Sequence, residues 1–214
     1  ASGVEYLRKD QIPEFELYLS FTGGQMLERL QREHGARMAR ALYGCVDPDA
    51  YRRVSPSELY SCSLSYMGTF APDRREKLER LFLEPAHQRP ELRFLLAGSM
   101  YPADWTVPSN LSLIEHVAPD QHPALYSSCE ATLNITRKDM ADAGFCPSGR
   151  LFEAAACSAP ILSDWWEGLD HFFQVDREIR IVHSAEDVLA ALDHDSADLR
   201  KMADQARRHT LEEH

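Results

Sequence analysis

Several motifs that identify common enzyme classes are missing from this sequence. It has no G-x-x-x-x-G-K-[ST] motif, which argues against a P-loop kinase or ATPase. No G-x-G-x-x-G follows an apolar run, which weakens a dinucleotide-binding interpretation. The sequence also has no G-x-S-x-G elbow, which argues against an α/β-hydrolase. The histidines include no H-E-x-x-H, and His209 and His214 lie off one helical face. We therefore expect no metal site.

Long apolar runs and a cysteine framework are also missing. No run approaches the ~20 apolar residues of a transmembrane helix. The start, ASGVEYLRKDQ, lacks the apolar core of a secretory signal and an initiator methionine, so we expect a fragment of a longer protein. Five scattered cysteines without C-x-x-C favour a reducing, cytoplasmic location. The net charge of -11 argues against general binding of nucleic acid or of an acidic membrane surface.

Apolar residues, by contrast, are plentiful: they make up 44% of the 214 residues, enough for one complete core and part of another domain. After residue 60, apolar runs predict buried strands that alternate for the most part with helical patterns. The predicted strands are 61–67, 92–97, 111–117, 131–135, 160–162 and 178–182. This alternation predicts an α/β fold with a doubly wound parallel sheet.

The first 60 residues have a different organisation. Strands are predicted at 16–21 and 37–43, with a helix carrying Met26, Leu27 and Leu30 between them. One such unit, within 1–45, cannot bury both faces of a sheet alone. Two prolines and few large apolar residues make 46–60 a linker, and 61–214 the main domain.

Five residues lie at or just past the ends of predicted strands of the main domain, or in the loops that follow them. They are Gly68, Gly98, Val117, Thr136 and Gly149. Carboxyl ends of parallel strands meet at one edge of a sheet, where ligands bind in doubly wound folds. This convergence is the main sequence support for a nucleotide site.

The stretch from Cys146 to Phe173 predicts a loop, helix, strand, loop and helix. Ser148 is a plausible N-cap, Gly149 allows close approach, and Arg150 offers a fork suited to phosphate. Glu153, one turn later, is placed to accept hydrogen bonds from a ribose diol. The alternative is an ordinary helix with a solvent-exposed Arg150–Glu153 pair.

Two further positions have competing interpretations. Asp73 and Glu76 fit a capping box, which leaves Arg74 in a first helical turn beside the Gly68-Thr69 turn, where a bound anion would suit it. The alternative is a solvated arginine. His116 stacks on a base in one interpretation, whereas in the other it is a structural residue at a strand end.

Three segments, SYMGTFAPDRREKLERL, LNITR and SGRLFEAAACSAPILSDWWEGL, resemble the CgeB-like (spore maturation protein) glycosyltransferases. The resemblance implies the nucleotide-sugar-binding half of a GT-B fold. It also implies that 1–45 is the tail of a second, acceptor-side α/β domain, with the Gly23-Gly24 turn facing the interdomain cleft. The sequence departs from the family pattern twice. Phe145 stands where GT-B enzymes carry an acidic residue at the reacting sugar, and Ser158 stands where glycine is usual.

The resemblance implies a glycosyltransferase that uses a nucleotide-diphosphate sugar, needs no metal or other cofactor, and acts on an unidentified acceptor. Glu153 would hold the ribose, while Ser148, Gly149 and Arg150 would hold the diphosphate. Arg74 would assist from the facing loop, and His116 and Val117 would flank the base. The alternatives are a non-catalytic nucleotide-binding module and a scaffolding domain that keeps the half-fold.

Overall fold

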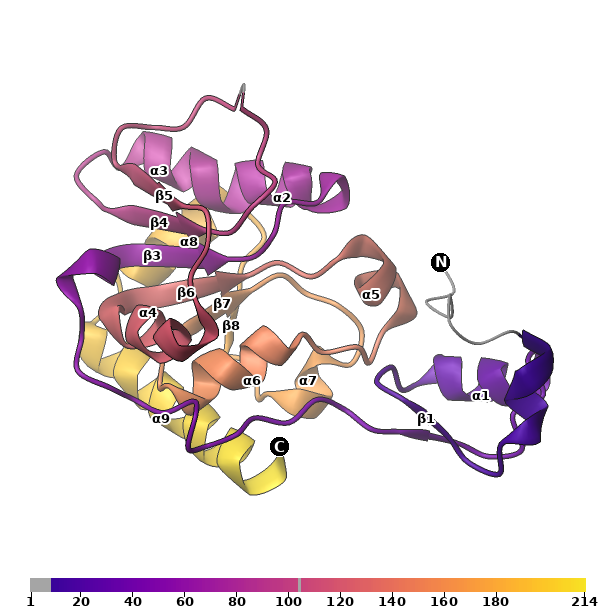
Figure 1. Cartoon of the computed structure of the whole chain (residues 1–214). Coiled ribbons are helices and arrows are strands. Elements are labelled where there is room, and N and C mark those ends of the chain that lie inside the picture. Colours follow the sequence, from indigo (N-terminus) through magenta and orange to yellow (C-terminus); the bar gives the residue numbers. More distant parts are fainter. Residues whose placement is uncertain (1–8, 104) are drawn as a thin grey trace.

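The computed structural model describes residues 9–103 and 105–214, so residues 1–8 of the predicted 1–45 segment lie outside the described residues. Its main feature is a six-stranded parallel sheet in the order β5-β4-β3-β6-β7-β8 (Figure 1). The strands are β3 (Cys62–Met67), β4 (Phe94–Ala97), β5 (Leu111–Ile114), β6 (Cys129–Asn134), β7 (Ile161–Ser163) and β8 (Arg180–Ile181). This order is that of a doubly wound sheet, which confirms the predicted fold class.

Helices cover both faces of the sheet (Figure 1). One face carries the continuous helical run η3 (Pro72–Arg74), α2 (Arg75–Leu78), η4 (Glu79–Leu83) and α3 (Glu84–Gln88), together with α8 (Ala185–Leu192). The other face carries α4 (His122–Ser128), α6 (Gly149–Ala156), α7 (Leu169–Phe172) and α9 (Ser196–Glu213). The short elements η2 (Glu58–Tyr60), η5 (Pro119–Gln121) and α5 (Lys138–Ala143) lie in the connections.

The two cores follow from the alternation of side chains along each strand. In β4, Phe94 and Leu96 belong to the core under α2 and α3, while Leu95 and Ala97 belong to the core under α4 and α6. All four are buried, which is why this strand reads as one unbroken apolar run.

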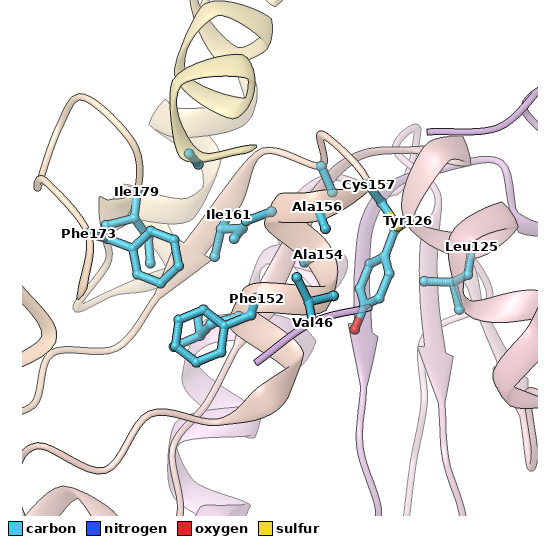
Figure 2. Packing of buried hydrophobic residues seen from close by; sticks show 14 of the residues in the cluster. Val46, Leu125, Tyr126, Phe152, Ala154, Ala156, Cys157, Ile161, Phe173 and Ile179 are labelled. Carbon is cyan, nitrogen blue, oxygen red and sulfur yellow. The ribbon is translucent and has the colours of Figure 1, made fainter. Parts of the chain in front are cut away.

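Helix α6 occupies the middle of the second core. Figure 2 shows Phe152, Ala154 and Ala156 of α6 among Ile161 of β7 and Tyr126 of α4. The run Ala154, Ala155, Ala156 is fully buried and leaves room for α9 to pack along α6. Helix α6 is therefore held firmly from three sides, and its first turn is fixed at the carboxyl edge of the sheet.

A smaller unit lies beyond one end of the main sheet (Figure 1). It contains η1 (Lys9–Glu14), β1 (Tyr18–Ser20), α1 (Gln25–Arg32) and β2 (Ala39–Ala41), with β1 and β2 paired in parallel. Its core is small, with Ile12, Leu30, Ala36 and Ala39 buried. The strand–helix–strand prediction for this part of the chain is confirmed.

Three local predictions were wrong. Asp73 does not cap a helix, because the helical run begins as a 3₁₀ turn at Pro72 and its N-cap makes no side-chain hydrogen bond. Instead, Asp73 accepts a hydrogen bond from the backbone N–H of Lys138 (2.8 Å) and pairs with Arg137 (2.9 Å). The segment after Thr136, which we expected to be a loop as far as Gly144, contains α5, and the strand predicted over 111–117 ends at Ile114. In the described part of the chain, no helix is long and apolar enough to cross a membrane.

Candidate nucleotide site

Two glycines bring the ends of β3 and β4 into close contact. A Cβ atom on Gly98 would lie 2.1 Å from the carbonyl oxygen of Gly68, and Gly98 has a φ of +150°. Only glycine suits this position, because both the space and the backbone conformation exclude a side chain. The hydroxyl of Tyr101 donates a hydrogen bond to the same Gly68 carbonyl (2.6 Å). The Gly68-Thr69 turn is therefore fixed at the carboxyl edge.

Arg150 lies across the junction of β3 and β6, where the strand order reverses. Its guanidinium donates hydrogen bonds to the carbonyl oxygens of Met67 (2.5 Å) and Ile135 (3.3 Å), and its Nε donates to Ser148 Oγ (3.2 Å). The guanidinium carbon lies 5.8 Å from the centre of the Tyr66 ring. Arg150 is thus not the solvent-exposed residue of the alternative interpretation. It ties α6 to two strand ends, with guanidinium N–H groups to spare for a ligand.

Arg74 is a buried cation beside this junction. It is 7% exposed, its Nη2 donates to the Thr69 carbonyl, and its Nε has no hydrogen-bond partner. Among the described residues no carboxylate pairs with it. Burial lowers the pKa of Arg74, and the positive charges of Arg150 and Arg137 act in the same direction. A buried, uncompensated guanidinium costs stability unless an anion binds it.

Thr136 and its neighbours form a polar network at the end of β6. The backbone N–H of Thr136 donates to Asp164 Oδ1 (3.0 Å), and Asn134 donates to Thr136 Oγ1 (3.3 Å). Asp164 is buried and pairs with Lys77 through its other oxygen (2.6 Å). Thr136 therefore lies at the predicted edge, where its own hydrogen bonds fix the end of β6.

Glu153 lies one turn into α6, above Gly149. The Glu153 Oε1 atom is 3.9 Å from where a Cβ on Gly149 would lie, so the carboxylate turns back toward the helix N-terminus. Ser148 is the N-cap, as predicted, but its side chain makes no capping hydrogen bond. Burial raises the pKa of Glu153, against smaller opposing effects of His122, the Tyr51 hydroxyl and Arg150. A half-buried carboxylate with few donors is suited to a ligand that supplies hydroxyl groups.

Two residues near Glu153 were missed by the sequence interpretation. Burial raises the pKa of Tyr51, from the predicted linker, to about 12, and the nearby Glu153 carboxylate acts in the same direction. His122, at the start of α4, contacts the Tyr51 hydroxyl through Nδ1 (3.2 Å) and the Val117 carbonyl through Nε2 (3.2 Å). No local signal links Tyr51 to His122, which is 71 residues away.

The residues predicted to flank a base lie in the loop after β5. Val117 is buried and its carbonyl is held by His122, whereas His116 is exposed. In this structure, then, the imidazole that contacts the other site residues belongs to His122 rather than His116.

The Gly23-Gly24 turn contacts the loop that precedes α6. The N–H of Gly23 donates to the Phe145 carbonyl (2.9 Å), and a Cβ on Gly24 would lie 2.5 Å from the Phe145 ring. The same ring covers Gly168, where a Cβ would lie 2.6 Å away. Phe145 itself has a φ of +44°. Its side chain fills the space between two glycine turns, so the smaller unit reaches the main domain just before the Ser148 cap.

No group of three or more metal-ligating side chains is present within residues 9–103 and 105–214. All five cysteines are free, and burial raises the pKa of Cys157 to about 12 and that of Cys129 to about 11. These two thiols are consequently protonated at neutral pH and are poor nucleophiles. The chemistry at this edge rests on arginine, glutamate, histidine and backbone N–H groups.

Comparison with known proteins gives a family and a fold. A family model described as "Glycosyl transferase-like" matches residues 74–214. No curated protein matches the chain at a significant level. Similar solved structures include sucrose-phosphate synthase from Thermosynechococcus elongatus, with 14% identity, a TM-score of 0.71, and coverage of 95% of this chain and 55% of that one.

Several similar structures contain nucleotides, including these two. Anabaena Alr3699/HepE in complex with UDP-glucose has 12% identity and a TM-score of 0.68, covering 92% of this chain and 59% of that one. The pneumococcal O-GlcNAc transferase GtfA in complex with UDP and GlcNAc has 14% identity and a TM-score of 0.59, covering 95% of this chain and 43% of that one. The chain thus spans about half the length of these three structures, and at such identities the likeness shows the fold alone.

Proposed function

This chain belongs to the glycosyl transferase-like family, and we propose that it binds a UDP-sugar at the carboxyl edge of β3 and β6 and serves sugar transfer to an acceptor. Within the family, the motifs quoted above favour a CgeB-like member. The choice of UDP is supported by HepE and GtfA, which are complexed with UDP-glucose and with UDP and GlcNAc.

The observation that carries this proposal is the environment of Arg74. Its guanidinium is buried without a carboxylate partner among the described residues, and Arg150 and Arg137 lie near enough to act on its pKa. A cluster of arginines in a chain of net charge -11 requires a specific explanation. A bound diphosphate would provide it, because its negative charges would pair with the guanidinium groups of Arg74 and Arg150, whereas Arg137 is already paired with Asp73.

The other roles follow from the positions around this cluster. The first turn of α6 presents the N–H groups of Gly149 and Arg150 to the same edge, where they favour negative charge. Glu153, one turn further, accepts the ribose hydroxyls. As the bond to the sugar breaks, negative charge grows on the diphosphate, and these fixed donors stabilise it. Gly98 lets the ends of β3 and β4 approach each other, and Gly68 leaves room for the Arg150 guanidinium at this edge. No step requires a metal ion.

We interpret residues 1–45 as part of the acceptor-side domain and 46–60 as the linker. The contact between Gly23 and Phe145 supports a cleft at this boundary, because it brings the Gly23-Gly24 turn next to the loop that leads into Ser148. An acceptor would approach the sugar from this side.

One observation favours a second candidate, a nucleotide-binding module without transferase activity. Phe145 replaces the acidic residue of the GT-B pattern, and its ring is packed between Gly24 and Gly168. A phenyl ring cannot hydrogen-bond a sugar hydroxyl or bear charge. This candidate predicts nucleotide binding with no turnover of any UDP-sugar.

A thermal-shift panel of UDP, GDP, ADP, CDP and dTDP tests the site. At about 100 times its dissociation constant, UDP should stabilise the protein by roughly 2.7 kcal/mol and raise Tm by roughly 5–10 °C. Arg74→Met and Glu153→Gln should each reduce this shift, whereas Arg80→Met, a matched exposed arginine of the same helical run, should retain it. No shift with any diphosphate would contradict the proposal.

Turnover separates the two candidates. Release of UDP from UDP-glucose or UDP-GlcNAc, measured with a coupled assay, is expected for the transferase and should fall in Arg74→Met. Binding of UDP with no release from either donor, with or without oligosaccharide acceptors, would favour the second candidate.

A further inference from the structure

Two ion pairs tie the helical run after β3 to the loop between β6 and α5. Asp73, in the first turn of the run, pairs with Arg137 (2.9 Å) and accepts a hydrogen bond from the Lys138 N–H (2.8 Å). Lys77 pairs with Asp164 (2.6 Å), whose other oxygen holds the loop backbone. The Asp164 side chain is 5% exposed, whereas that of Arg137 is 50% exposed. The Asp73–Arg137 pair is therefore the weaker of the two, and the loop remains held when it opens.

Arg137 adjoins the cationic site described above. It lies two residues after Ile135, whose carbonyl accepts a hydrogen bond from Arg150 (3.3 Å). Its partner Asp73 immediately precedes Arg74. The pair is thus next to both of the arginines that we assign to the diphosphate. In the described part of the chain only Nε of Arg137 is hydrogen-bonded, so the other N–H groups of its guanidinium are available to a ligand.

The charge of the bound diphosphate increases when the sugar leaves. In an intact UDP-sugar each phosphate carries a single negative charge. When the bond between the sugar carbon and the phosphate oxygen breaks, its electron pair stays on that oxygen, while the sugar passes to the acceptor oxygen and the acceptor proton to solvent. The terminal phosphate of UDP then carries roughly 1.5 to 2 negative charges at neutral pH. Arg74 and Arg150 balance the intact donor, so the additional charge of UDP has no partner in them.

We propose that Arg137 moves from Asp73 to the terminal phosphate of UDP, and that the Asp73–Arg137 pair thereby determines how the site discriminates UDP from the intact donor. This inference rests on the proposed function, since it takes a UDP-sugar as the donor. Asp73 competes with the ligand for Arg137. UDP, with its additional charge, displaces the carboxylate, whereas the intact donor leaves the pair closed. Asp73 consequently limits the affinity of the product and favours its release.

The test measures the dissociation constants of UDP and UDP-glucose by calorimetry. Arg137→Met should weaken UDP alone, so the constant for UDP-glucose divided by that for UDP should fall by about 5-fold, the upper end for a half-exposed ion pair. Asp73→Asn keeps an oxygen for the Lys138 N–H but has no charge to hold Arg137, so it should raise the ratio by a similar factor. Asp142→Asn is the matched control, because Asp142 is an exposed carboxylate that pairs with Lys138 (2.6 Å), and it should leave the ratio unchanged.

A structural role for the pair predicts a different pattern. If Asp73 and Arg137 only fix the loop between β6 and α5, both variants weaken UDP and UDP-glucose equally and the ratio stays constant, which would overturn the inference. The double variant Asp73→Asn/Arg137→Met should have the ratio of Arg137→Met, because Asp73 acts through Arg137. A ratio as high as that of Asp73→Asn would contradict this coupling.

The outcomes also separate this inference from the function on which it rests. If Asp73→Asn does not fold, Arg137→Met is sufficient, since an unchanged ratio in that variant overturns the inference. If Arg74→Met weakens both ligands while Arg137→Met leaves their ratio unchanged, the inference is overturned and the function stands. If the unaltered protein binds neither ligand, both are overturned.

Discussion

Ser158 occupies a position where the family pattern has glycine. It follows α6 with a φ of +55°. The N–H of Ser158 bonds to the Ala155 carbonyl (2.9 Å), and that of Ala159 bonds to the Ala154 carbonyl (3.0 Å). This is a Schellman motif, whose left-handed position glycine occupies most easily. The usual glycine at this site is thus explained by backbone conformation, and serine there is strained.

Ser158→Gly should therefore stabilise the protein. We expect a gain of about 1 kcal/mol, or roughly 2–4 °C in Tm, because glycine adopts a positive φ without steric cost. Ser158→Ala is the matched control, since it removes the hydroxyl but keeps the strained Cβ, and it should not raise Tm. Equal stabilisation in both variants, measured by calorimetry, would show that the hydroxyl rather than the backbone was responsible.

At the scale of elements, the site depends on how closely strand ends approach each other. Strands β3 and β4 are adjacent and parallel, and Gly68 follows one while Gly98 follows the other. Their contact fixes the position of the Gly68-Thr69 turn. The Thr69 carbonyl in this turn accepts a hydrogen bond from Arg74. The position of the buried guanidinium is therefore linked to a glycine in the neighbouring connection.

Gly98→Ala should disrupt this arrangement. The added methyl group would lie 2.1 Å from a backbone oxygen at a φ of +150°, so we expect a loss of about 3 kcal/mol or more in the free energy of unfolding. Gly44→Ala is the matched control, because a Cβ there meets nothing within 4 Å. Urea unfolding curves of the two variants provide the measurement. Equal stability of Gly98→Ala and Gly44→Ala would mean that the Gly68-Thr69 turn moves to accommodate the methyl group and therefore does not fix the position of Arg74.

At the scale of the whole molecule, one apolar surface lies outside the main domain. The register pairs Leu19 with Arg40 and alternation continues along both strands, so one face of the β1–β2 pair carries Leu17, Leu19, Phe21, Met38 and Leu42. Phe21 is 70% exposed and Leu42 is 60% exposed. Parallel strands are usually covered on both faces, so this face is suited to packing against a further layer.

The double variant Leu19→Lys/Phe21→Lys should remove much of this surface. We expect lower fluorescence of the dye ANS, which binds exposed apolar patches, and no loss of UDP binding. Leu59→Lys is the control, since Leu59 is 69% exposed but belongs to no such face. If the control lowers fluorescence as much as the double variant, the β1–β2 face is not a distinct apolar patch.

The sequence predicted what depends on local pattern, and it missed what depends on long-range contacts. Most strands of the main sheet were placed well, because apolar periodicity is a property of neighbouring residues. The carboxyl edge and the position of Glu153 could also be predicted. The burial of Arg74, the strand-end contacts of Arg150, and the Tyr51–His122 pair could not, since each depends on residues brought together by folding. Asp73 was wrongly assigned to a cap because Arg137 and Lys138, 64 and 65 positions later, occupy its carboxylate.

A crystal structure of the protein with UDP would test the proposed site. The diphosphate should lie within hydrogen-bonding distance of the Arg74 guanidinium and the first N–H groups of α6, with the ribose hydroxyls on Glu153. Occupation of any other surface, with Arg74 Nε still without a partner, would contradict it.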